Sequence, residues 1–172
     1  MTSKLKTDVL ETVSGSGTIA LTNQLSGMTS ASVPSGSVVQ VVTVNDNTQQ
    51  ATSSTSWVAT TLVAAITPSS TSSKILVTFN MPAYQASGGY HEAATIFRGA
   101  ISGTNLGGTN WGFGSVTTAS QSVLGVVSGS YLDSPNTTSS QTYTVAHRVD
   151  NGTGYAMINS CMGAITLTEI KG

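Results

Sequence analysis

The fold of this chain is decided by three runs between residues 38 and 79: VVQVVTV (Val38–Val44), WVATTLVAAI (Trp57–Ile66) and ILVTF (Ile75–Phe79). Polar segments rich in Ser, Thr and Asn separate them, and the second connection, TPSSTSSK, also contains a proline. Runs rich in Val, Ile, Thr and aromatic residues that are bounded by such segments are typical of β-strands. The sequence therefore predicts three strands in quick succession.

Alternation within these runs predicts a shared core, because every second side chain of a strand points to the same face. Val38–Val44 is apolar on both faces except at Gln40 and Thr43, which predicts either a central strand or a strand covered by another subunit. On the other two runs, six apolar residues fall on matching faces and are expected to enter one core: Leu62, Ala64, Ile66, Ile75, Val77 and Phe79.

Composition narrows the class of protein. Only 8% of the 172 residues are charged and 38% are hydrophobic, with a net charge of −1, and this combination is not typical of disordered chains. The six basic residues form no patch for nucleic acid. No apolar run is long enough to insert in a membrane, and no secretion signal precedes the first strand. The single Cys161 excludes a disulfide framework within one chain and is expected to be a small buried residue.

Residues 1–36 differ from the rest of the chain. Their few apolar residues are widely spaced among Ser, Thr and Gly, so we expect an extended stem that buries them against identical neighbours, with a flexible tail as the alternative. Pro34-Ser35-Gly36 is the expected joint to a head domain of residues 37–172. The start of the stem mixes charged and apolar residues, which suits docking on another protein, although a solvated terminus fits equally well: Lys4, Leu5, Lys6, Asp8, Val9 and Leu10.

The rest of the head predicts further short strands and no convincing helix. A Gly/Asn-rich loop spans residues 99–114, and Asp150–Gly154 is the clearest hairpin turn. Turn signals recur about every ten residues, which favours an all-β, jelly-roll-like β-sandwich. The strands are expected at residues 93–98, 116–127, 141–148, 155–160 and 164–170.

Aromatic residues in two loops are the candidate binding residues, because Tyr and Trp combine a broad apolar face with a polar group. The set consists of Tyr84, Tyr90, His91, Trp111 and Phe113. Trp111 has an equal alternative, in which it packs under its own loop. Trp57, at the start of a strand, is expected in the core.

The sequence gives little support to catalysis. His91-Glu92 suggests acid–base chemistry or half of a metal site, but only His147 could join it, and no metal-binding spacing is present. Glycan hydrolysis would need two carboxylates placed across a sugar, and the acidic residues at Asp133 and Asp150 stand in turn sequences instead. We therefore expect no enzyme, no cofactor and no metal.

Several phrases of the sequence resemble tailed-phage virion proteins, notably fibre-like proteins of marine and cyanobacterial phages. The matching phrases are ITPSSTSSKILV (Ile66–Val77), SYLDSP (Ser130–Pro135), QTYTV (Gln141–Val145), ITLTEI (Ile165–Ile170) and, at the start, LKTDVL (Leu5–Leu10) with GSGT (Gly15–Thr18). Ser and Thr dominate these phrases, so their order and spacing carry the resemblance. It implies a trimeric, virion-exposed, all-β protein without a catalytic motif.

Together these observations predict a homotrimeric phage protein on the virion surface, made in the host cytoplasm. As a short tail fibre it would contribute to host attachment, with the head contacting a host cell-surface glycan and the N-terminal segment holding another virion protein. The alternative is a capsid decoration protein anchored by that segment, whose shortness favours this location. A small glycan-acting enzyme is the third hypothesis. Neither nucleic acid nor membrane is an expected partner.

Overall fold

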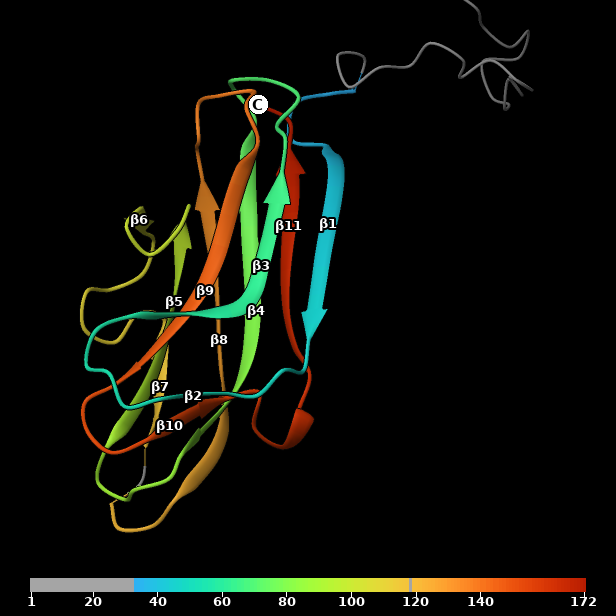
Figure 1. The fold of residues 1–172 in the computed structure, drawn as a ribbon. Coiled ribbons are helices and arrows are strands. Elements are labelled where there is room, and N and C mark those ends of the chain that lie inside the picture. The colour runs from blue at the N-terminus through green and yellow to red at the C-terminus, as the bar shows by residue number, and fades with distance from the viewer. Residues whose placement is uncertain (1–32, 118) are drawn as a thin grey trace, which may run out of the picture. The chain divides into compact units, whose positions relative to one another are not determined.

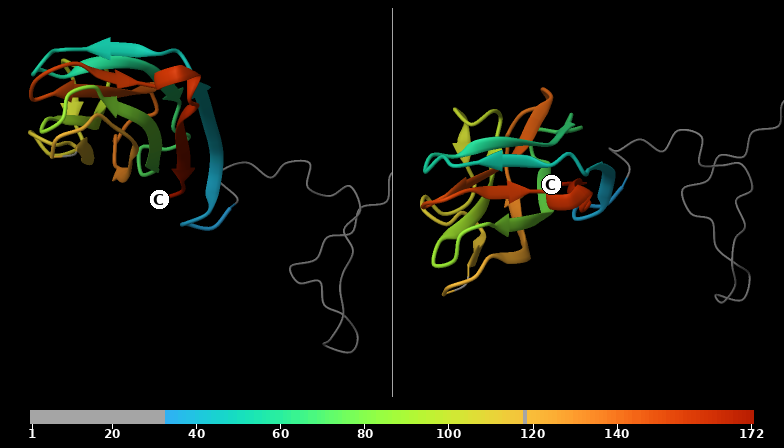
Figure 2. Two further views of the ribbon diagram at one scale, coloured as in Figure 1. Left: turned by 90° about the horizontal axis from the view of Figure 1, so that it is seen from below. Right: turned by 60° about the horizontal axis from the view of Figure 1, so that its bottom comes forward.

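Two antiparallel β-sheets pack face to face in the described part of the chain (Figures 1 and 2). Our computed structural model describes residues 33–117 and 119–172. Sheet A is centred on its longest strand, β4, which has β8 on one edge and both β11 and β10 on the other. Its strands are β8 (Val123–Asp133), β4 (Lys74–Gln85), β11 (Gly163–Ile170), β1 (Val38–Asp46), β10 (Gly154–Ala156) and β2 (Gln50–Thr52).

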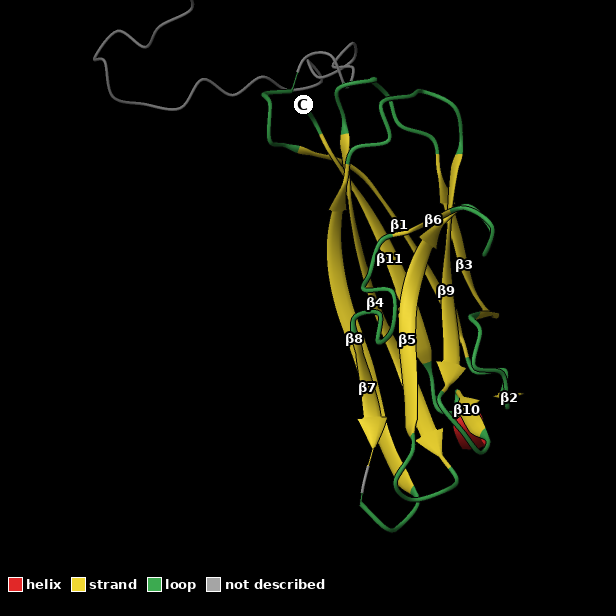
Figure 3. Ribbon diagram, turned by 90° about the vertical axis from the view of Figure 1, so that its left-hand side faces the viewer, coloured by secondary structure: helices red, strands yellow, loops and turns green. Residues whose placement is uncertain are grey.

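Sheet B lies against sheet A, and its strands follow one another across the view in Figure 3. The order is β3, β9 and β5, and the far edge of β5 is shared by β7 and β6. These strands are β3 (Val58–Ile66), β9 (Gln141–Val149), β5 (His91–Arg98), β7 (Gly114–Thr117) and β6 (Thr104–Asn105). A 3₁₀ turn, η2 (Ile158–Ser160), follows β10.

The strand order defines the topology. Among the described residues, eight strands have four or more residues, and they are taken here in chain order. Sheet A places them first, eighth, third and sixth, and sheet B places them second, seventh, fourth and fifth. This is the order of a jelly roll, in which two Greek keys wrap around one core. The predicted all-β, jelly-roll-like sandwich is confirmed.

The core between the sheets contains the predicted residues. All six apolar side chains expected from the second and third runs are at most 5% exposed. From β11 they are joined by Ile165 and Leu167. Where β8 passes over the core, Gly129 allows close approach, because a Cβ atom there would lie 2.6 Å from the ring of Phe113.

Four local predictions are corrected by the structure. Val38–Val44 lies in β1, which pairs only with β11 and is therefore an edge strand rather than a central one. The turn at Asp150–Gly154 carries the chain from β9 in sheet B to β10 in sheet A, so it does not close a hairpin. Trp57 is absent from the core cluster and lies at an open hollow on the outside of sheet B. The strand expected at residues 116–127 is divided between β7 and β8.

Both ends of the described unit lie at one end of the sandwich. Lys171 bonds to Gly36 and Ser37 through its backbone, and its Nζ donates to the carbonyl oxygen of Val33 at 2.6 Å. The docking residues predicted between Lys4 and Leu10 lie outside the described residues. Within the described residues, no helix is long and apolar enough to cross a membrane.

Candidate binding site

The predicted binding residues do not form one cluster. Tyr84 lies on the outer face of sheet A, where its ring centroid is 5.9 Å from that of Tyr155. The rings of His91 and Trp111 stack 4.4 Å apart on the outer face of sheet B. Phe113 packs edge-on against the core residue Phe79. Tyr90 is 36% exposed in the β4–β5 turn.

The outer face of sheet B carries a hollow that the sequence did not reveal. Its central charged residue is Arg148, whose guanidinium carbon lies 5.4 Å from the ring centroid of Trp57 and 5.9 Å from that of Trp111. The hollow has a volume of about 440 Å³. We call it the Arg148 hollow; its lining consists of Thr55, Ser56, Trp57, Phe97, Ile101, Asn105, Thr109 and Arg148.

Local structure explains why these residues meet. In β9, Tyr143, Val145 and His147 are buried, so alternation turns Arg148 outward. Arg148 lies opposite Ala93 in the sheet, and this small neighbour leaves space around the long side chain.

The β5–β7 connection forms the second wall of the hollow. It folds back along β5, with backbone N–H groups of Leu106 and Phe113 donating to the carbonyl oxygens of Ile96 and Ala94. Gly112 has a φ of +55°, and a Cβ atom there would collide with Ala94. Glycine at this position therefore allows the loop to carry Trp111 close to the sheet.

The two arginines of sheet B, Arg148 and Arg98, differ in their hydrogen-bond and ion-pair partners. Arg98 Nη1 donates to both carboxylate oxygens of Asp133, at 3.0 and 3.1 Å. The same carboxylate accepts a hydrogen bond from the hydroxyl group of Tyr143. The pKa of Tyr143 is raised, mainly by burial of the side chain and secondly by this hydrogen bond. Arg148 has no hydrogen-bond or ion-pair partner within residues 33–117 and 119–172, and its Nε is buried.

Of the residues weighed for catalysis, His91-Glu92 with His147 as the third member, Glu92 and His147 meet in the structure, whereas His91 pairs with Asp150. His147 Nδ1 lies 2.9 Å from Glu92 Oε1, and the backbone N–H of Tyr155 donates to Oε2. Both side chains have 0% exposure and lie between the sheets. In the described part of the chain, no group of three or more His, Cys, Asp or Glu residues could hold a metal.

A second histidine–carboxylate pair lies on the outside of the same sheet. His91 Nδ1 is 2.9 Å from Asp150 Oδ2, and its backbone N–H donates to Oδ1 at 2.7 Å. Burial alone would raise the pKa of Asp150, but the hydrogen bonds and charge of His91 outweigh it, so this pKa is lowered. The pair holds the start of β5 against the β9–β10 turn and stacks under Trp111.

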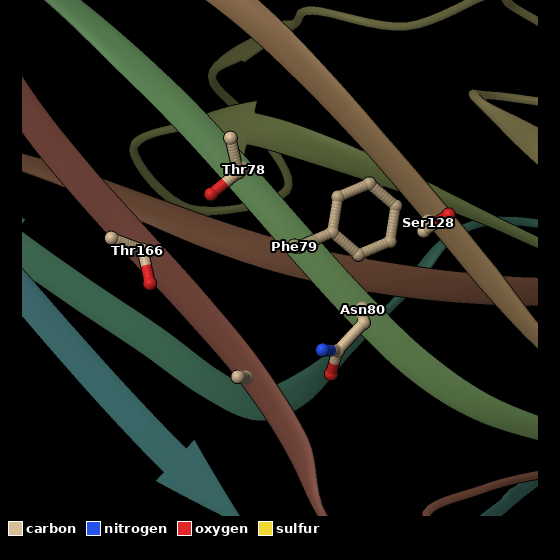
Figure 4. A pocket seen from close by; sticks show the side chains of 6 residues that line it. Thr78, Phe79, Asn80, Ser128 and Thr166 are labelled. Carbon is tan, nitrogen blue, oxygen red and sulfur yellow. The ribbon is translucent and has the colours of Figure 1, made fainter.

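The outer face of sheet A differs from that of sheet B in that it is shallow and mostly apolar or neutral. At its centre is a shallow hollow of about 280 Å³, lined by Thr78, Phe79, Asn80, Ser128, Ala164 and Thr166 (Figure 4). Four large apolar side chains around it are 47–60% exposed, namely Val41, Leu124, Val126 and Leu132. The outward residue Lys74, at the first position of β4, is charged and exposed. We call the uncharged remainder of this surface the sheet A face; its outward residues are Val41, Thr43, Asn45, Leu76, Thr78, Asn80, Tyr84, Leu124, Val126, Ser128, Ser130, Leu132, Ala164, Thr166 and Thr168.

Comparison with known proteins gives a fold but no family. No protein-family model and no curated protein sequence matches the chain. Among solved structures, it is similar to a protein of T=1 particles derived from infectious bursal virus, with a TM-score of 0.51 and 12% identity over 77% of this chain. It is equally similar, at a TM-score of 0.51 and 13% identity over 77% of this chain, to a protein of the T13 particle of infectious bursal disease virus. The match spans about a third of either viral chain. The sandwich is therefore of the kind found in viral particle proteins.

Proposed function

We propose that the protein is a structural component of the surface of a virus particle, and that it works there as a homotrimer. The observation that carries this proposal is the uncharged sheet A face, on a jelly roll shared with proteins of viral particles. The sequence phrases that resemble tailed-phage fibre proteins support the same class. No catalytic activity belongs to the proposal.

The sheet A face suits contact between copies of this chain. Large exposed apolar patches mark interaction surfaces, and the core of a subunit interface is depleted in charge. A neutral face also meets its own copies without like-charge repulsion, and closed symmetry could cover it completely. Val41 on the edge strand β1 extends this face, which fits the alternative that another subunit covers Val38–Val44.

In its more specific form, the proposal is a short tail fibre of a tailed phage. Residues 1–36 would dock on another virion protein, and the heads would contribute to host attachment through contact with a cell-surface glycan. Several weak contacts from three heads would add through avidity. The outer face of sheet B, with its aromatic side chains, supports this role because it remains open when sheet A is covered.

Capsid decoration is the second candidate. The observation that favours it is that the viral proteins of similar fold come from T=1 and T13 particles. The same face of sheet A would then pack within a trimer on the capsid, and the head would project from it.

Two measurements test the proposal and separate its two forms. Sedimentation equilibrium should give three times the chain mass of 17.5 kDa. Gold-labelled antibody against the head, imaged on intact phage particles that encode the protein, should label the tail for a fibre and the whole capsid for a decoration protein. A monomeric mass would refute the trimer, and unlabelled particles would refute the virion role.

A further inference from the structure

We propose that the Arg148 hollow binds a sugar residue that carries a carboxylate. The inference deepens the proposed attachment role and rests on it for its biological meaning, while the binding itself is a property of the head. The carboxylate would pair with the Arg148 guanidinium, and the sugar ring would lie against the indole of Trp57. The hydroxyl and amide groups of the lining would contact the sugar hydroxyls.

The charge of the hollow selects an anion. Arg148 is its only charged lining residue, and the neighbouring carboxylate of Asp150 is already bonded to His91. A guanidinium binds a planar carboxylate through two parallel hydrogen bonds. The one cation of the lining matches a monoanionic group better than a phosphate cluster, which usually needs several donors. A protein whose charged residues are otherwise so few has left this cation without a partner among the described residues.

The lining also selects a ring with one apolar face. Trp57, Phe97 and Ile101 form the apolar part of the hollow, and Thr55, Ser56, Asn105 and Thr109 form its polar part. Ligand sites typically combine an apolar lining with a few placed polar groups. A pyranose ring has the same division, because its C–H groups gather on its faces and its hydroxyls lie around its rim. A Trp side chain is well suited to contact the C–H face of the ring, and Ser, Thr and Asn side chains are suited to bind the hydroxyls of its rim.

The position of the hollow fits a ligand presented from outside the particle. Arg148 is near the end of β9, and this end of the strand lies away from the end of the sandwich that holds residues 33–37 and Lys171 (Figure 1). The chain therefore enters the head at one end and presents Arg148 toward the other.

A purely structural role for Arg148 makes a different prediction. If the guanidinium only ties Trp57 to Trp111, its removal should lower stability and leave no ligand-dependent signal. These two residues are the only tryptophans of the chain, and both flank Arg148. The intrinsic fluorescence of the wild-type protein therefore reports on this hollow without a label.

The experiment titrates the full-length protein with trigalacturonic acid and, separately, with its methyl ester, which keeps the sugar and removes the charge. We expect a saturable change in tryptophan emission with the acid, weakened by added salt, and at least tenfold weaker binding of the ester. Arg148→Gln should reduce affinity for the acid by about 10- to 100-fold, the range of a hydrogen bond to a charged group. Lys74→Gln, which removes an exposed cation from sheet A, should bind like the wild type.

A second variant guards against a folding defect in Arg148→Gln. Thr55 is an exposed residue of the lining, so Thr55→Glu would place a competing carboxylate beside Arg148 and should abolish binding while the melting temperature is retained. Equal binding of acid and ester, no emission change with either, or unchanged binding by both variants would overturn the proposal. If a trimeric protein on labelled particles binds neither saccharide, only this inference fails. If the head binds the acid and particles carry no label, only the virion role fails.

Discussion

The two outer faces of the sandwich differ in the kind of contact they can make. The sheet A face is broad, shallow and without charge, and its four large apolar side chains are about half exposed or more. The outer face of sheet B is covered in part by the β5–β7 connection, which leaves a hollow beside two tryptophans and Arg148, an arginine with no hydrogen-bond or ion-pair partner in the described part of the chain. One face is suited to another protein surface and the other to a small polar ligand.

This difference arises from the residues that the core does not constrain. Both sheets contribute Val, Ile, Leu and Ala to the same interior, so their inner faces are alike. Residues at outward positions of the strands need only be compatible with a pleated sheet. Their side chains can therefore differ between the two sheets and take part in binding. Under the proposed function, assembly and recognition would therefore be separated between opposite faces of one scaffold.

The largest effect should come from disrupting the interior behind sheet B. In Glu92→Ala, the His147 ring and the backbone N–H of Tyr155 lose their buried acceptor. An unsatisfied buried group costs about 1–3 kcal/mol, so the free energy of unfolding should fall by several kcal/mol in urea denaturation. The matched control is Asp150→Asn, at the partly exposed pair of the same 2.9 Å length, which should cost about 1 kcal/mol or less. Equal losses would contradict the assignment of inner and outer roles.

Period-two alternation explains why the core could be predicted. The six residues between Leu62 and Phe79 needed only to be alternately apolar, and any packing of two sheets would bury them. Strand β11 was predictable for the same reason. The jelly-roll class followed from many short strands with regular turns and no helical period.

Long-range pairing explains what could not be predicted. The turn after β9 has the right local residues, and Gly152 adopts a φ of +73°, but the choice between pairing back and crossing to sheet A is not local. Alternation counted back from Leu62 turns the side chain of Trp57 outward, so its position outside the core was predictable from the sequence. Its meeting with Arg148 was not, because it depends on the β3–β9 register, in which Val58 lies opposite His147.

The second effect tests the assembly face directly. Val126→Lys places a charge in the exposed apolar part of the sheet A face and should convert the trimer into monomers, measured by sedimentation equilibrium. Val63→Lys makes the same change at a similarly apolar, 38% exposed residue of sheet B and should leave the trimer intact. Both variants should remain folded, because surface substitutions usually change stability by about 0.5 kcal/mol or less. Dissociation by Val63→Lys alone would assign assembly to the other face.

The third effect is a dependence of stability on pH that involves two carboxylates, Glu169 in β11 and Asp150 in the β9–β10 turn. Burial alone would raise the pKa of Glu169, but hydrogen bonds from Gln40 and Ser69 outweigh it and lower this pKa below 4.5. The pKa of Asp150, in the β9–β10 turn, is shifted in the same direction from 3.8. A lowered folded-state pKa stabilises the fold fully above the unfolded-state pKa, and this contribution is lost as pH falls through the folded-state value.

Urea denaturation at about pH 6 and about pH 3 should therefore show lower stability in acid, with a slope of at most about 1.4 kcal/mol per pH unit for each group. Glu169→Gln should be less stable than the wild type at the higher pH and approach it at the lower one. An identical pH profile in the variant would show that the hydrogen bonds of Glu169 do not favour its charged form.

The smallest effect distinguishes two aromatic residues that the sequence placed in one candidate site. Trp111 is 41% exposed and contacts His91 and Arg148, so Trp111→Ala should cost only about 0.5–1 kcal/mol of stability, the value of an exposed cation–π contact. Phe113→Ala should cost more, about 2 kcal/mol or above, because its ring fills the space beneath Gly129 against Phe79. Thermal melting of the two variants orders these costs, and adsorption of the purified head to host cells tests function. Attachment that is lost in Trp111→Ala at nearly unchanged melting temperature would assign Trp111 to recognition, whereas a loss of stability equal to that of Phe113→Ala would assign both rings to packing.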